Sequence, residues 1–186
     1  MTQQSIPRIP TYEALALQIR QLGVECVFGL ISDDTAMLVT AMNGAGVPFH
    51  GARHENNAVA MAEGYASATG KLAIVILGRG PATANGLHGI VYARKSGAPV
   101  LVIVGASADG VPNPNAMGPD NKLLDAAAVF QGAGVRHMTA HDPETAPQVA
   151  AQLRTFQDAV LSGRLLGAAP PDEFAPEAPA PASVPV

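Results

Sequence analysis

A single glutamate, placed where a strand runs into a helix, is the residue best suited to chemistry in this 186-residue sequence. Glu55 lies in the run HENNAVAMAEGYASATG, residues 54–70, directly after the end of a predicted strand. In an open parallel sheet, ligands bind beyond the carboxyl ends of the strands, so a carboxylate there points into the binding crevice. The positive end of a helix dipole also favours an acidic residue at that place without any function. The position of Glu55 alone therefore leaves both explanations open.

A glycine-rich turn is the second feature that could do chemistry. The run LGRGPATANGL, residues 77–87, joins a strongly apolar strand to a helix. Backbone N–H groups in such a turn can bind a phosphate, which would suggest a mononucleotide-binding domain. No G-x-G-x-x-G follows the first predicted strand and no G-x-x-x-x-G-K-[ST] occurs in the sequence, so both nucleotide-binding fingerprints are missing. The turn could equally be a plain connection between strand and helix.

Both features lie in a chain that alternates between helical and strand patterns. Helices are predicted at 12–22, 34–43, 54–69 and 84–96, and strands at 26–28, 48–51, 72–77 and 100–104. The runs AIVIL and VLVIV contain no polar residue, as expected of central strands that are covered on both faces. The pattern predicts an α/β fold with a three-layer, doubly wound, mainly parallel sheet and helices on both faces.

The remainder of the chain is predicted to form a loop, two helices and a tail. Residues 108–121 are rich in Pro, Gly and Asn and should form a long surface loop, before helices at 122–130 and 143–161. From residue 167 onward Ala and Pro dominate, with too few apolar residues to offset the entropy lost on ordering. We therefore expect one domain at 1–166 and a flexible Ala/Pro-rich tail or linker at 167–186.

Composition narrows the class of protein. With 48% hydrophobic and 14% charged residues the chain is globular, and a net charge of -4 without a basic run argues against a nucleic-acid partner. The sequence has a single cysteine, Cys26, so an internal disulfide is impossible. Cys26 is expected to be a buried strand residue. The N-terminus lacks a signal-peptide pattern, and no apolar run approaches the ~20 residues that span a membrane. We expect a soluble, cytoplasmic protein without a membrane partner.

Four short motifs in a fixed order carry a resemblance to a known family. They are VFGL at 27–30, HENNAVAMAEGYASATGK at 54–71, GPATAN at 80–85 and APVLVIVG at 98–105. Together they resemble the N-terminal pyrimidine-binding (PYR) domain of thiamine diphosphate enzymes, in the acetolactate synthase and pyruvate oxidase group. The resemblance is clear over residues 10–110 and looser over 110–165. It implies a domain that supplies only half of an active site.

The resemblance implies roles for four residues. Glu55 matches the family's glutamate that hydrogen-bonds the aminopyrimidine ring of thiamine diphosphate and favours its imino form. Gly80, Pro81 and Asn85 match the turn that lies against the pyrimidine ring, where glycine lets the backbone approach closely. The implied function is decarboxylation of a 2-oxo acid, acetolactate synthase-like carboligation, or both, with the cofactor supplying the difficult chemistry.

Four further residues could face the substrate. Ile31 and Ser32 stand where the family commonly has Pro-Gly, in a segment that faces the cofactor and substrate. Arg79 replaces a small Ser or Thr and could grip a substrate carboxylate, although a surface arginine is the simpler explanation. His88 could donate a proton, although a packed or solvated helix histidine is the more common case. Substrate choice therefore stays open.

The sequence lacks the second half of the family's site. Complete enzymes carry a G-D-G motif and a following Asn that bind magnesium and the diphosphate, and this sequence contains no G-D-G. The pair Asp33-Asp34 is in the wrong place for that metal and is typical of a turn or helix start, so we predict no metal site in this chain. The resemblance then implies that Mg²⁺ is held mainly by a separate diphosphate-binding (PP-domain) subunit, in a homo- or hetero-oligomer.

Two functions follow from these observations. Glu55 favours an enzyme subunit, or a fragment of a longer enzyme in which the Ala/Pro-rich tail is an interdomain linker. The departures at Ile31, Ser32 and Arg79 favour instead a non-catalytic assembly or binding module that has kept the PYR fold. Binding of thiamine diphosphate by a complex with the diphosphate-binding partner distinguishes the two.

Overall fold

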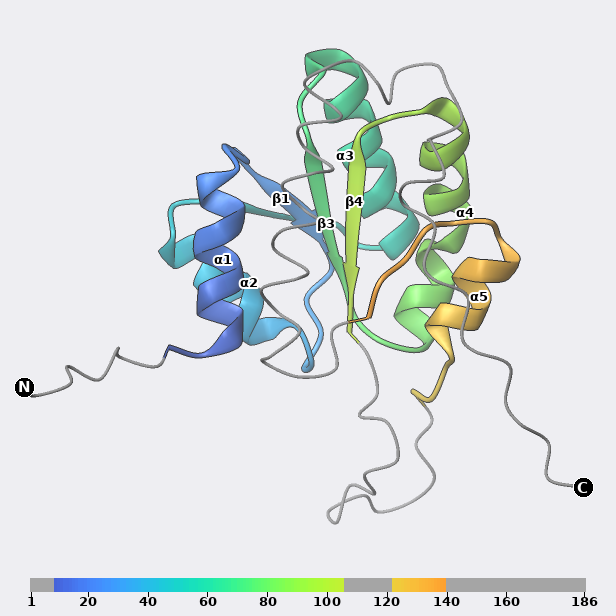
Figure 1. The fold of residues 1–186 in the computed structure, drawn as a ribbon, viewed down its shortest axis with the longest axis horizontal. Helices are drawn as coiled ribbons and strands as arrows, with labels where there is room; N and C mark the ends of the chain where they lie inside the picture. The colour runs from blue at the N-terminus through green and yellow to red at the C-terminus, as the bar shows by residue number, and fades with distance from the viewer. Residues whose placement is uncertain (1–8, 106–121, 140–186) are drawn as a thin grey trace, which may run out of the picture.

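A parallel sheet with helices on both faces forms the described part of the chain (Figure 1). The computed structural model describes residues 9–105 and 122–139. Its strands are β1 (Val27–Gly29), β2 (Phe49–Gly51), β3 (Ala73–Leu77) and β4 (Val100–Val104), all paired in parallel in the order β2-β1-β3-β4. Its helices are α1 (Thr11–Gln21), α2 (Ala36–Gly44), α3 (Glu55–Thr69), α4 (Pro81–Ser96) and α5 (Ala126–Gly132). The predicted α/β fold is confirmed.

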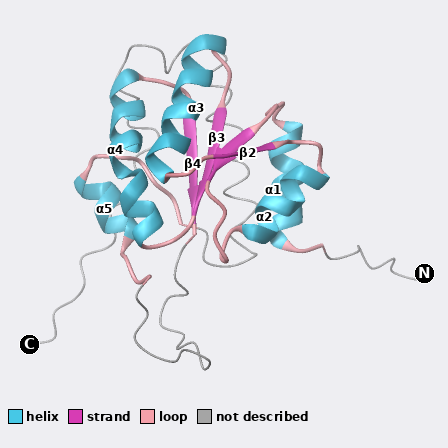
Figure 2. Cartoon of the chain, turned by 180° about the vertical axis from the view of Figure 1, so that it is seen from behind, coloured by secondary structure: helices cyan, strands magenta, loops and turns pink. Residues whose placement is uncertain are grey.

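Side chains of the strands alternate between two hydrophobic cores, one on each face of the sheet. Ile74 and Ile76 of β3 belong to the core beneath α1 and α2, together with Ile19 and Met42. The residues that alternate with them along β3, Ala73, Val75 and Leu77, belong to the second core, beneath α3, α4 and α5. Figure 2 shows these two groups of helices on opposite sides of the strands. This alternation is expected of parallel strands covered on both faces, and it confirms the three-layer arrangement.

The two aliphatic strands have different places in the sheet. β3 lies between β1 and β4 and is buried throughout, whereas β4 is the edge of the described strands and is half-buried throughout. Within the described residues, the prediction that VLVIV is a central strand is therefore wrong. An aliphatic run indicates that both faces of a strand are covered by helices, and it says nothing about how many strands lie beside it.

Two of the described helices begin three or more residues away from the predicted start. α4 begins at Pro81 instead of residue 84, because Gly80 adopts φ 64 and ψ -118 and Pro81 fits the first helical position, where an N–H is not needed. α5 begins at Ala126 instead of residue 122, where the Asp125 side chain caps the helix. In both cases a local capping residue, and not the apolar pattern, decides where the helix begins.

Several predicted segments lie outside the described residues. They are the loop at 108–121, the helix at 143–161 and the tail at 167–186. In the ranges 9–105 and 122–139, no helix combines the length and the apolar character needed to cross a bilayer.

Glycines allow close approach at two places in the core. A Cβ at Gly29 would lie 2.2 Å from the carbonyl oxygen of Ile76 and 2.9 Å from the ring of Phe49. Between α3 and α4, a Cβ at Gly89 would lie 2.9 Å from Cβ of Val59. Only a residue without a side chain fits at either place. The two helices therefore pack closely enough for side chains from both to share one site.

A cluster around Glu25 joins segments at the amino ends of the strands, just before β1. Tyr65 Oη donates to Glu25 Oε2 at 2.9 Å, and Lys71 forms an ion pair with the other carboxylate oxygen. Burial and the hydrogen bond with Glu25 raise the pKa of Tyr65 to about 12. Cys26 lies before β1 and is half-buried, so its predicted place inside the strand is wrong. Burial raises the pKa of its thiol.

Gly29→Ala is expected to destabilise the chain, because the added methyl group would overlap the backbone of β3. Overpacking of this kind costs about 3 kcal/mol, which urea unfolding followed by circular dichroism would measure. Gly64→Ala in α3 is the control, since no atom lies within 4 Å of its Cβ position and alanine favours a helix. Equal stability of the two variants would contradict the packing described.

Tyr65→Phe is expected to reduce the loss of stability at alkaline pH. The pKa of Tyr65 is raised to about 12 in the folded chain, so the unfolded chain releases its phenol proton first. The stabilisation is therefore fully present below about pH 10, the usual pKa of tyrosine, and is lost as the pH rises through the folded pKa. Urea unfolding on both sides of that pH measures the slope. Tyr92→Phe, at an exposed position of α4, is the control variant.

Candidate functional site

Glu55 is buried at the start of α3. His54 caps this helix, because its Nδ1 accepts a hydrogen bond from the backbone N–H of Asn56 at 3.2 Å and its own backbone is extended. Only 8% of Glu55 is exposed, so its carboxylate is largely withdrawn from water. A carboxylate in such a place needs hydrogen-bond donors to offset the loss of hydration.

Asn85 of α4 supplies a donor to Glu55. Its Nδ2 donates to Oε2 of Glu55 over 3.2 Å. Gly86 makes the approach of α4 possible, since a Cβ there would lie 2.6 Å from Cδ1 of Leu77 and 3.8 Å from Cβ of Glu55. A carboxylate has about four lone-pair sites, so acceptor capacity beyond the bond to Asn85 exists for a ligand. The structure thus brings together two of the predicted site residues.

The glycine-rich turn between β3 and α4 is held tightly. Thr83, which is fully buried, donates from Oγ1 to the carbonyl oxygen of Gly78 at 2.9 Å. Gly80 has φ 64, and a Cβ there would lie 2.3 Å from the carbonyl oxygen of Lys122. Glycine is therefore required both for the backbone conformation and for the close approach. Pro81, the next residue, is exposed.

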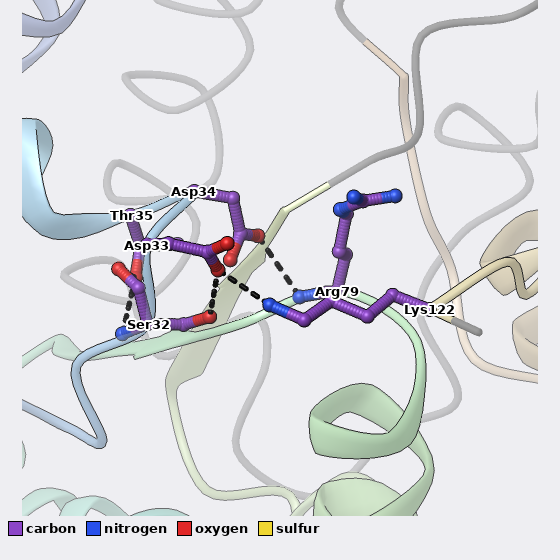
Figure 3. A network of polar contacts seen from close by, with 6 residues as sticks. All are labelled: Ser32, Asp33, Asp34, Thr35, Arg79 and Lys122. Atoms are coloured by element: carbon purple, nitrogen blue, oxygen red, sulfur yellow. Dashed lines mark hydrogen bonds and ion pairs between the residues drawn. The ribbon is translucent and has the colours of Figure 1, made fainter. Parts of the chain in front are cut away.

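A polar network joins the segment after β1 to the turn after β3 (Figure 3). Ser32 Oγ donates to Asp33 Oδ1 at 2.9 Å, and Lys122 Nζ forms an ion pair with the same oxygen at 2.6 Å. Asp34 Oδ2 accepts a hydrogen bond from the backbone N–H of Arg79 at 2.9 Å. The hydrogen bonds from Lys122 and Ser32 hold the pKa of Asp33 well below its usual range. Segments far apart in the sequence meet in this network.

The two remaining predicted substrate residues lie at the surface. Ile31 is 56% exposed and precedes the network of Figure 3. His88 is exposed on α4, with its Nδ1 3.3 Å from Oδ1 of Asn56 on α3. With the amide oxygen as acceptor, Nδ1 of His88 is the donor in this pair. His88 is therefore tied to the residue that follows Glu55.

Sequence reasoning missed the contacts of three residues. Thr83 carried a detectable signal, because a threonine in the first turn of a helix often bonds back to the preceding backbone. The sequence alone predicts Asp34 only as a turn or helix-start residue and places Lys122 inside a helix. No local pattern links them to their partners. In the described ranges, no three His, Cys, Asp or Glu side chains gather so that they could hold a metal ion.

Residues 10–120 match the family model described as thiamine pyrophosphate enzyme, N-terminal TPP binding domain. The chain belongs to this family. Thiamine pyrophosphate is another name for thiamine diphosphate, so the match confirms the resemblance found in the sequence motifs. The matched residues include Glu55, Asn85 and the turn between them.

This N-terminal domain is similar to parts of enzymes with different names. It is 39% identical to the acetolactate synthase large subunit of Lactococcus lactis over 93 residues, which are 49% of this chain and 16% of the relative. It is 34% identical over 91 residues to a probable 2-ketoarginine decarboxylase of Pseudomonas aeruginosa, again 49% of this chain and 16% of the relative. It is 28% identical over 102 residues to the sulfoacetaldehyde acetyltransferase of Rhodobacter capsulatus, 55% of this chain and 17% of the relative. The chain thus matches only a small part of each relative's length.

Asn85→Ala is expected to destabilise the chain, because it removes a donor from the buried carboxylate of Glu55. The loss should be about 1–3 kcal/mol in urea unfolding. Glu55→Gln in the same chain should reduce this loss, since a neutral amide is less costly to bury than a carboxylate. Asn57→Ala, at an exposed position of α3, is the control. A loss no larger than that of the control would contradict the described contact.

Proposed function

We propose that this chain is the pyrimidine-binding half of a thiamine diphosphate-dependent enzyme that acts on 2-oxo acids by decarboxylation, carboligation or both. The observation that carries the proposal is the buried carboxylate of Glu55, held by Asn85 in a chain of the N-terminal TPP-binding family. The proposed role of Glu55 is to hydrogen-bond the aminopyrimidine ring and hold a proton there.

The residues present fit this cofactor. Glu55 has acceptor capacity beyond its bond to Asn85, and Asn85 orients the carboxylate. Gly80, with φ 64, precedes Pro81 at the start of α4, and neither residue adds a long side chain to the turn. When bound, thiamine diphosphate supplies the nucleophilic carbon and the electron sink for reaction at the 2-oxo group. The residues proposed to face the substrate are Ile31, Ser32, Arg79 and His88.

The remainder of the active site is proposed to come from another subunit. The chain spans 16% of the Lactococcus lactis relative, and its sequence contains no G-D-G motif. We propose that a PP-domain subunit binds Mg²⁺ and the diphosphate, and that the site forms at the interface of a homo- or hetero-oligomer. In this arrangement residues 1–166 form the domain and 167–186 a tail or linker.

Co-expression with the product of the neighbouring reading frame tests this function. The complex is purified through a tag on this chain and titrated with thiamine diphosphate and Mg²⁺ by calorimetry. We expect the complex to bind the cofactor, and Glu55→Gln to lower turnover of a 2-oxo acid by about 10²-fold, because an amide cannot exchange a proton. Glu63→Gln, further along α3, is the matched control and should keep the wild-type turnover.

Two outcomes would redirect the proposal. Full turnover by Glu55→Gln would contradict the role given to this carboxylate. A stable oligomer that binds no thiamine diphosphate with any PP-domain partner would support the non-catalytic assembly module, which the residues at Ile31, Ser32 and Arg79 favour.

A further inference from the structure

We propose that Asp34 is a positioning residue of the cofactor site. By accepting the hydrogen bond from the backbone N–H of Arg79, it holds the turn that begins α4 and thereby places Asn85 beside Glu55. The effect of Asp34 on cofactor binding rests on the proposed function. Its structural part concerns only contacts within this chain.

The carboxylate of Asp34 sits where the segments that follow three strands converge (Figure 3). Its Oδ2 lies 2.9 Å from the backbone nitrogen of Arg79, which follows β3. A Cβ at Gly105, the residue after β4, would lie only 1.6 Å from the same oxygen. Asp34 itself follows β1. A hydrogen bond from an amide to a carboxylate is stronger than one between neutral groups, so this contact ties the segment after β1 to the segment after β3, with Gly105 packed closely beside it.

The turn held by Asp34 leads directly to Asn85. Gly80 follows Arg79 with φ 64, in a region that only glycine enters freely. From the helix side, the backbone N–H of Ala84 donates to the carbonyl oxygen of Gly80 at 3.0 Å. Asp34 restrains the other side of the same turn. Together with the hydrogen bond from Thr83 to Gly78, the two contacts fix where α4 begins and hence where Asn85 lies.

The neighbouring carboxylate has a different task. Asp33 bonds to Ser32 and Lys122, and its side chain is 73% exposed. It has the same chemistry as Asp34 and lies one residue away, but it does not accept the hydrogen bond from the N–H of Arg79. Asp33→Asn is therefore a matched control for contacts inside the chain. The other charged residues in the network of Figure 3 are Asp33, Arg79 and Lys122.

The first experiment uses the full 186-residue chain without cofactor. NMR spectroscopy follows the backbone amide of Arg79 and the side-chain amide of Asn85. Asp34→Ala should shift both signals, Asp34→Asn should shift them less because an acceptor oxygen remains, and Asp33→Asn should leave the Asn85 signal in place. Gly105→Ala should act like Asp34→Ala, because its methyl group would displace the carboxylate.

The second experiment measures binding of thiamine diphosphate with Mg²⁺ by the complex with the PP-domain partner. Asp34→Ala should weaken binding about tenfold, as expected for loss of one charge-assisted hydrogen bond. Asp34→Asn should recover part of this loss. Gly44→Ala, whose Cβ position has no atom within 4 Å, should bind as the wild type does. A purely structural role would lower stability in Asp34→Ala without this partial rescue of affinity by Asp34→Asn.

The Asn85 signal decides the inference even if the chain binds no cofactor. An unchanged Asn85 signal in folded Asp34→Ala would overturn the positioning role, whatever the activity of the complex. If Asp34→Ala does not fold, Gly105→Ala and Asp34→Asn take its place, and an unchanged Asn85 signal in both overturns the role equally. Shifted signals together with no cofactor binding by the wild-type complex would support the positioning of Asn85 and count against the proposed function alone.

Discussion

A buried carboxylate must find a hydrogen-bond donor, and in this chain the donor for Glu55 comes from a second helix. The bond from Asn85 is possible only if α3 and α4 lie close together where both begin. Gly86 and Gly89 provide that closeness, because a Cβ at either would overlap side chains of β3 or α3. The parallel sheet brings the starts of the two helices to the same place. The carboxyl ends of β2 and β3 point the same way, and β2 leads into α3 and β3 into α4.

The amino ends and the carboxyl ends of the strands are held by different contacts. Before β1, Glu25 joins Tyr65 and Lys71 through contacts between side chains, at a place that carries none of the predicted site residues. At the carboxyl ends of the strands, contacts to backbone are present beside contacts between side chains: Asp34 accepts from the N–H of Arg79, and Gly80 packs against Lys122. Contacts to backbone orient a turn whatever its side chains are. A site can therefore keep its geometry there while neighbouring side chains change.

Membership of the TPP-binding family indicates which cofactor the domain is built for, but it does not indicate one reaction. The relatives named above include a synthase, a decarboxylase and an acetyltransferase, all similar to the same part of this chain. A shared domain with different reactions is expected when the cofactor does the difficult chemistry and the surrounding residues select the substrate. Two of the positions proposed to face the substrate, Ser32 and Arg79, lie in the network of Figure 3.

The sequence by itself determined the order of helices and strands, the burial of both faces of the sheet, and the place of Glu55 and of the glycine turn. These features follow from apolar periodicity and from the chemistry of local turns, which act over a few residues. Only the tertiary structure decided that β4 is the edge of the described strands, that Asp34 binds the N–H of Arg79, and that Lys122 covers Gly80. The bonds of Asp34 to Arg79 and of Lys122 to Asp33 span 45 and 89 residues. No local rule relates residues so far apart, because their meeting depends on how the whole sheet brings its strand ends together.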